Sequence, residues 1–175
     1  MGVNHYMKIM EQQISNLCNL TDLHMFLNEI DMAYGSKVAY RYHVEDMIVD
    51  KTYSELTCDV KSIASWMVNK GYYGKHIAII GPTSYKWVAT FLGIICSANI
   101  ALPIDRLLSK KEIMSIFESG DVDAVFASDD FEDLLQEIEQ DKDSRIDVVR
   151  FDGDDFQDIL ATSPVQLPVP DPDSL

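Results

Sequence analysis

The segment "KWVATFLGIICSANIALPID", residues 86–105, places eighteen uncharged and mostly apolar residues between a lysine and an aspartate. A transmembrane helix needs about 20 predominantly apolar residues in one continuous run. Ser97, Asn99 and Pro103 interrupt the second half of this segment, and no basic cluster flanks it. We therefore predict that it does not span a membrane.

A helix followed by a strand accounts for the same residues. We expect the helix over about 84–97, a turn at Ser97 to Asn99, and a central strand over 99–104 that closes at Pro103 and Asp105. Elements that are buried on all sides need no charge. The lack of charge is therefore interpreted as burial beneath other helices.

The same alternation recurs along the chain. Further apolar runs, spaced about 23 residues apart, are "HIAII" (76–80), "DVDAVFA" (121–127) and "IDVVRF" (146–151), and amphipathic helical patterns lie between them. Short apolar strands that alternate with such helices are typical of a parallel sheet joined by right-handed crossovers. The sequence predicts an α/β fold of βαβ repeats, with a mostly parallel sheet and helices on both faces.

A small N-terminal β-hairpin is predicted before these repeats. Residues 37–50 alternate apolar and polar side chains on either side of a polar turn. The stretch "KTYSEL" then opens the longest helix, because Thr52 and Glu55 form a capping box. Gly71 is expected to end that helix in a left-handed conformation.

We divide the chain into three parts. Apolar residues at helical spacing predict an N-terminal helical segment over 1–20, and the α/β subdomain follows over 21–160. The segment over 161–175, "ATSPVQLPVPDPDSL", contains four prolines, which exclude a helix or a central strand. It is interpreted as an extended connector to a downstream region that the sequence does not include.

The net charge of −15 is distributed unevenly. Acidic and basic residues balance over 1–117, so the whole excess lies in residues 118–175. An acidic surface repels phosphate backbones, so we expect no nucleic-acid binding. The excess is interpreted as a solvated acidic face, with capture of a basic partner protein as the alternative.

Cysteine usage indicates a cytoplasmic protein. Cys18, Cys58 and Cys96 are odd in number and form no CxxC pair, which favours reduced core thiols over a disulfide framework. The N-terminus has no apolar signal-peptide core. The four histidines show no metal-ligand spacing.

Two short motifs follow strands at positions where ligand sites occur. "GPTSYKW" (81–87) has one glycine and no complete phosphate-loop pattern, so Thr83 or Ser84 is interpreted as a helix cap. Asp129 and Asp130 have the chemistry to hold Mg²⁺ or accept a phosphoryl group, as in response-regulator receivers, but capping of the next helix is preferred. We assign no catalytic, cofactor-binding or metal-ligating residue.

Several motifs, taken in order, resemble those of AMP-forming adenylating enzymes, which include acyl-CoA synthetases, nonribosomal peptide adenylation domains and firefly luciferase. "KTYSEL" is similar to the family's [ST]-Y-x-E-L signature, and "IICSANIALPID" to L-K-A-G-x-A-Y-V-P-I-D. Cys96 stands where lysine is usual and Ala98 where glycine is usual. The ordered set covers residues 22–130 and looks most like long-chain fatty acid–CoA ligases, with amino-acid adenylation domains second.

The resemblance implies the N-terminal scaffold of an enzyme that converts a carboxylic acid and ATP into an acyl-adenylate and then into a thioester. ATP, Mg²⁺ and coenzyme A would be the cofactors of the full-length enzyme, and the rest of its own polypeptide would be the partner of this part. The family's phosphate-binding loop follows an acidic-proline connector such as "PDPDSL". We therefore expect the 175-residue chain alone to bind none of these cofactors and to be inactive. A stand-alone flavodoxin- or receiver-like signalling module using Asp129 and Asp130 is the alternative from another class.

Overall fold

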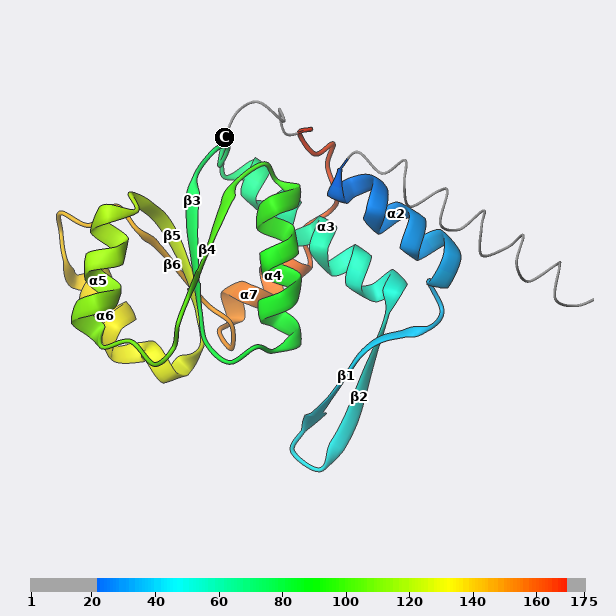
Figure 1. Cartoon of the computed structure of the whole chain (residues 1–175), viewed down its shortest axis with the longest axis horizontal. Coiled ribbons are helices and arrows are strands. Elements are labelled where there is room, and N and C mark those ends of the chain that lie inside the picture. The colour runs from blue at the N-terminus through cyan, green and yellow to red at the C-terminus, as the bar shows by residue number, and fades with distance from the viewer. Residues whose placement is uncertain (1–21, 170–175) are drawn as a thin grey trace, which may run out of the picture.

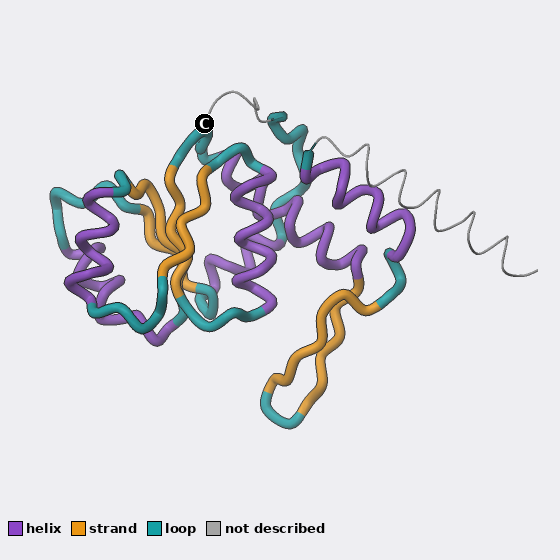
Figure 2. Tube along the Cα trace, viewed as in Figure 1, coloured by secondary structure: helices purple, strands orange, loops and turns teal. Residues whose placement is uncertain are grey.

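A four-stranded parallel sheet forms the centre of the protein, with helices on both faces (Figures 1 and 2). The computed structural model describes residues 22–169, so the helix predicted over 1–20 lies outside the described residues. The strands are β3 (His76–Ile80), β4 (Ile100–Ile104), β5 (Val122–Ala127) and β6 (Asp147–Arg150), in the spatial order β4-β3-β5-β6. All three pairings are parallel, which confirms the predicted βαβ repeats.

Two separate hydrophobic cores fill the space between the sheet and its helices. Alternate residues of a strand face opposite sides, so Ile77 and Phe126 belong to one core and Ile80 and Val125 to the other. The first core packs against α3, α4 and α7, and the second against α5 and α6. The helices are α2 (Leu23–Tyr34), α3 (Tyr53–Asn69), α4 (Tyr85–Cys96), α5 (Lys110–Ser119), α6 (Glu132–Gln140) and α7 (Asp154–Leu160), with a 3₁₀ turn η1 (Asp129–Phe131) before α6. The sequence pattern did not predict α7.

Side-chain caps begin three of the helices where the sequence indicates. The Thr52 hydroxyl accepts the backbone N–H of Glu55, and the Glu55 carboxylate accepts the backbone N–H of Thr52, so the capping box is complete. Ser109 and Glu112 form a second box at the start of α5. Ser84 caps α4 by accepting the backbone N–H three residues further on.

The helix after β5 begins differently from the prediction. Asp129 and Asp130 lie inside η1, and Ser128 occupies the N-cap position before them. The α-helix α6 starts at Glu132. The prediction that Asp129 caps a helix is therefore wrong, although acidic residues in a first turn still interact favourably with the helix dipole.

β4 is an edge strand and not the predicted central strand. Within the described residues it pairs with β3 alone, and Ile100 is 37% exposed. Pro103 lies inside β4 and cannot donate a ladder hydrogen bond, which is tolerated at the edge of a sheet. This proline was the signal in the sequence for an edge position.

Helix α4 is covered on one side, so the predicted burial beneath other helices is correct for one face only. Its inner residues Ala89 and Ile94 are buried in the core. Five large apolar residues on the rest of its surface are half-buried, and we call them the α4 apolar face: Trp87, Val88, Phe91, Leu92 and Ile95. Over residues 22–169, no helix is long and apolar enough to cross a membrane.

The turn between α4 and β4 contains a residue in the left-handed conformation. Ala98 has φ +57°, and its carbonyl accepts the backbone N–H of Gly74 at 2.9 Å. Next to it, the Asn99 side-chain oxygen accepts the backbone N–H of Lys75 at 2.9 Å. Left-handed geometry costs a residue with a Cβ about 1–2 kcal/mol, which explains why related sequences favour glycine here.

The predicted hairpin consists of β1 (Val38–Val44) and β2 (Met47–Thr52), and it projects away from the sheet (Figure 1). After α7, residues 162–169 lie outside helices and strands. The Val165 N–H donates to Ser65 Oγ on α3 at 3.0 Å, so the tail runs back along that helix.

Candidate functional site

A cleft of about 490 Å³ lies at the carboxyl ends of β3, β5 and β6. The chain leaves β3 toward β4 on one side and returns through β5 on the other, so the strand order reverses here. Open α/β sheets bind ligands at such a switch point. Hairpin residues close one side of this opening, which we call the switch-point cleft.

The ends of β3 and β5 touch at the base of the cleft. Ser128 N–H donates to the Ile80 carbonyl at 3.1 Å, and a Cβ at Gly81 would lie 2.9 Å from Ser128 Oγ. Gly81 also has φ +146°, a conformation that favours glycine. Ser128 Oγ is shielded from solvent and has no hydrogen-bond partner among the described residues, so it is available to a ligand or a water molecule.

Three tyrosines form an aromatic wall between the hairpin and α4. The rings of Tyr42 and Tyr85 stack with centroids 5.9 Å apart, and Tyr40 lies 5.7 Å from Tyr85. The Tyr85 hydroxyl donates to Asp59 Oδ2 at 2.6 Å. Burial, together with this hydrogen bond and the charge of Asp59, holds the pKa of Tyr85 well above its usual value. Tyr85 therefore stays protonated and positions the wall.

The charges at the mouth of the cleft compensate each other. Lys86 Nζ donates to Asp152 Oδ1 at 2.6 Å and to the Phe151 carbonyl at 2.8 Å. Backbone N–H groups at the start of α4 also face this region and suit an anion. A triphosphate requires positive charge that its own ligands do not neutralise, and the lysine that lines this cleft is already paired.

The predicted acidic pair lies outside the cleft lining. Asp129 and Asp130 are exposed on η1. At the end of β6, Arg150 binds Glu132 and Glu139 at 2.8 Å each, and these hydrogen bonds raise the pKa of the guanidinium above its ordinary value. Among residues 22–169, no three or more His, Cys, Asp or Glu side chains form a group that could hold a metal ion.

The cysteines divide between core and surface. Burial is the main cause that raises the pKa of Cys96 to about 12, as expected for a core thiol. Cys58 is exposed on α3, so the prediction that it is a core thiol is wrong. Cys18 lies outside the described residues.

The residues to which the sequence gave structural roles keep them. Pro103 lies in β4, and Asp105 closes the strand by accepting the backbone N–H of Leu107 at 2.9 Å. The switch-point cleft itself was missed, because its hairpin wall is far from the strand ends in sequence. Two polar motifs that directly follow neighbouring strands, one after Ile80 and one after Ala127, were the signal that could have located it.

The chain matches the family model described as AMP-binding enzyme over residues 30–175. A fatty acyl CoA synthetase from Mycobacterium tuberculosis superposes with a TM-score of 0.70 at 17% identity, covering 86% of this chain and 30% of that chain. For a benzoate CoA ligase from Burkholderia xenovorans, the TM-score is 0.69 at 18% identity, with 83% and 29% covered.

A fatty acyl-adenylate ligase from L. pneumophila, in complex with acyl adenylate and pyrophosphate, gives a TM-score of 0.64 at 17% identity, covering 85% of this chain and 26% of that chain. No curated protein sequence matches the chain. At these identities the structural likeness establishes the fold, and the chain spans less than a third of the length of these three structures.

Proposed function

The chain belongs to the AMP-binding enzyme family, and from this membership we propose that it is the N-terminal scaffold of an AMP-forming acyl-CoA synthetase. That enzyme joins a carboxylate to ATP, releases pyrophosphate, and passes the acyl group from the adenylate to coenzyme A. We favour a long-chain fatty acid as the substrate. Activation of an amino acid by an adenylation domain of the same superfamily is the alternative.

The observation that carries the proposal is the α4 apolar face. Single apolar residues on a surface need no explanation, whereas a contiguous apolar patch marks an interaction site. Trp87 and Phe91 stack with ring centroids 5.6 Å apart, and Phe26 on the neighbouring helix α2 is 37% exposed. Because the chain spans less than a third of the length of its structural neighbours, we propose that the remainder of the same enzyme covers this face.

The hairpin supports the same assignment. Val44, Met47 and Ile48 at its tip are 44%, 62% and 61% exposed. A projecting two-stranded hairpin is marginally stable by itself, and its base is held by the tyrosine wall. The exposed tip is a second surface on which a further layer of protein would pack.

ATP does not fit the switch-point cleft as the described residues form it. Lys86 is bonded to Asp152, so the cleft lacks the uncompensated cation that a triphosphate needs. We therefore derive no catalytic step from this chain, and its part in the reaction is to support the segments that carry the chemistry.

Calorimetric titration of the chain with Mg-ATP tests this function. We expect no binding in the micromolar range and no pyrophosphate release with palmitate, whereas micromolar binding would contradict the scaffold role. Sequencing the gene beyond the codon for Leu175 is a second test. A Ser/Thr/Gly-rich loop with a lysine supports the proposal, and a stop codon opposes it.

A receiver-like module is the rival from another class. Asp129 and Asp130 follow β5, one of the two strands at the switch point. Labelling with acetyl phosphate discriminates the two functions. Incorporation that is lost in Asp129→Asn or Asp130→Asn would favour the receiver, and we expect no incorporation.

A further inference from the structure

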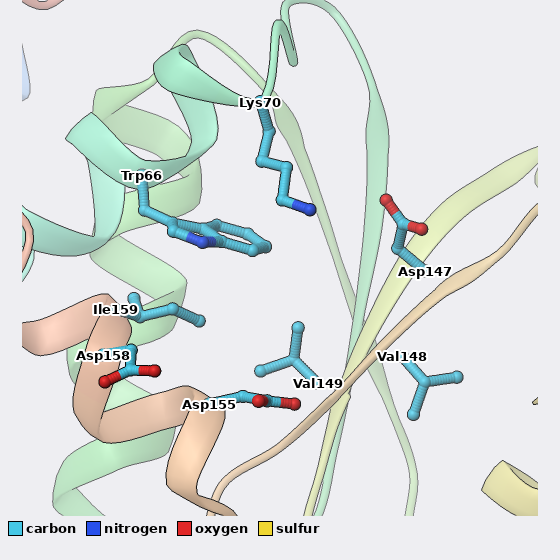
Figure 3. A pocket seen from close by; sticks show the side chains of 8 residues that line it. All are labelled: Trp66, Lys70, Asp147, Val148, Val149, Asp155, Asp158 and Ile159. Carbon is cyan, nitrogen blue, oxygen red and sulfur yellow. The ribbon is translucent and has the colours of Figure 1, made fainter.

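A second hollow, of about 310 Å³, lies along the outer edge of β6 between α3 and α7 (Figure 3). Its apolar part consists of the Trp66 indole together with Val149 and Ile159, and these side chains face one another in Figure 3. The indole is fixed, because the rings of Tyr72 and Phe126 pack edge-on against it with centroids 6.0 and 5.9 Å away. We call this hollow the β6-edge groove.

The backbone of β6 offers hydrogen-bonding groups beside the groove. Phe151 N–H donates to the Ala127 carbonyl at 2.9 Å, toward β5. Successive residues of a strand direct their backbone groups alternately to its two sides, so the N–H and C=O of Val148 point away from β5. In the described part of the chain, β6 is the last strand of the sheet. An exposed edge of this kind accepts a further strand.

The charges around the groove are mainly negative. Asp147, Asp155 and Asp158 contribute three carboxylates, against the single ammonium of Lys70. Lys70 Nζ lies 5.5 Å from the Trp66 ring centroid, and Asp147 accepts a hydrogen bond from the Tyr72 hydroxyl. The groove is therefore complementary to a segment that carries positive charge.

Two other occupants are less compatible with this charge. The printed residues 170–175 contain two aspartates and two prolines, so they supply neither positive charge nor a full set of N–H donors. A second copy of the chain carries the same net charge of −15, and its acidic α7 would face an acidic groove.

We propose that the β6-edge groove binds an extended, basic segment of another protein as an additional strand of the sheet. The segment exchanges backbone hydrogen bonds with Val148. Its alternate side chains enter the groove, where their stems pack on Trp66 and Val149 and their charged ends reach Asp155 and Asp158. This inference does not depend on the proposed enzymatic role.

The probe is a capped eight-residue peptide in which arginine alternates with valine, titrated into the whole chain. We expect saturable binding that weakens as salt increases, with the Val148 amide among the largest NMR shift changes. A matched peptide with glutamate in place of arginine should bind at least about tenfold more weakly. Equal affinity for the two peptides would overturn the proposal.

Substitutions in α7 separate the groove from general attraction to an acidic protein. Asp155→Asn and Asp158→Asn should each lower the affinity by about twofold to fivefold, as expected for exposed ion pairs. Asp154→Asn, in the same exposed first turn but outside the groove, is the matched control and should leave the affinity unchanged. An equal effect of all three substitutions would assign the binding to net charge alone and contradict the proposal.

The edge itself is tested with Val148→Pro. Proline at this position removes an N–H that points away from β5, so the β5–β6 pairing is retained, and peptide binding should be lost. Val148→Thr keeps the N–H and should bind normally, which controls for the side chain. If Val148→Pro has native circular dichroism and still binds the peptide, strand addition is excluded. If instead the unliganded wild type is a dimer that Val148→Pro dissociates, a second copy occupies the edge and the proposal is wrong.

Discussion

Gly93 of α4 lies so close to Ile63 of α3 that a Cβ at Gly93 would stand 2.7 Å from Ile63 Cγ2. It would also lie 3.4 Å from the Val60 carbonyl oxygen. The two helices therefore meet backbone to side chain, and this close approach places the start of α4 beneath the hairpin and against the switch-point cleft.

Replacing Gly93 by alanine should destabilise the protein. Alanine favours a helix by about 0.5–1 kcal/mol over glycine, but overpacking a close contact costs about 1–3 kcal/mol. Because Ile63 is β-branched and fully buried, it has little room to move. We expect Gly93→Ala to lower the free energy of unfolding by about 1 kcal/mol, measured by urea denaturation.

The double variant Gly93→Ala with Ile63→Val identifies the contact responsible. Removing one methylene from the neighbour should recover part of the loss, so the two substitutions should be non-additive. If their effects simply add, the contact between these two residues is not the cause.

Ala98→Gly should stabilise the protein. The φ of +57° at Ala98 is unfavourable for a residue with a Cβ, and glycine removes that cost although it makes the unfolded chain more flexible. The net gain should be about 0.5–1 kcal/mol, read from the thermal and urea midpoints. Ala161→Gly is the control, because Ala161 has φ −83°, and there glycine should lower stability. A loss at both positions would contradict the explanation.

The aromatic wall depends on the hydroxyl that joins Tyr85 to Asp59. Tyr85→Phe removes the donor of a 2.6 Å hydrogen bond from a residue that is 4% exposed. Hydrogen bonds to charged groups contribute about 1.5–3 kcal/mol, but Lys51 still binds Asp59 at 3.2 Å in the variant. We therefore expect a loss of about 1 kcal/mol in chemical denaturation. Tyr73→Phe, at a tyrosine that is 60% exposed, should change stability little, and equal losses would refute the role of this bond.

The strands were predictable because their apolar runs are continuous. "HIAII" matches β3 at both ends, since a strand covered on both faces has no exposed position to interrupt it. The edge position of β4 was harder to predict, because a strand covered by helices stays apolar even where one edge is free. Pro103 was the available signal.

The cleft and the groove depend on tertiary contacts that leave little trace in the sequence. Trp66 and Asp147 meet across the β6-edge groove although eighty residues separate them. α7 has seven residues, too few for a helical period to emerge from an acidic stretch. Asp129 was misassigned as a cap because a 3₁₀ turn precedes α6, and the periodicity of the sequence does not distinguish the two kinds of turn.

Acid should destabilise the protein partly through Arg150. Its hydrogen bonds hold the pKa of Glu132 and the pKa of Glu139 below their usual value, and an unfolded glutamate titrates near about 4.3. A carboxylate whose pKa is lower in the folded state contributes stability that is present above about pH 4.3. That contribution is lost as the pH falls through the folded-state pKa.

Arg150→Gln should therefore flatten the pH dependence of stability below about pH 4.3. Thermal midpoints of the wild type and the variant, measured from pH 7 to pH 3, should differ most at neutral pH and converge in acid. Arg41→Gln is the matched control, because it breaks an ion pair with Asp50 that lies in the projecting hairpin and is more exposed. Salt screens such a pair more strongly, so its effect on the thermal midpoint should be smaller. If the Arg150→Gln and wild-type curves stay parallel down to pH 3, the two glutamates do not couple folding to pH through this arginine.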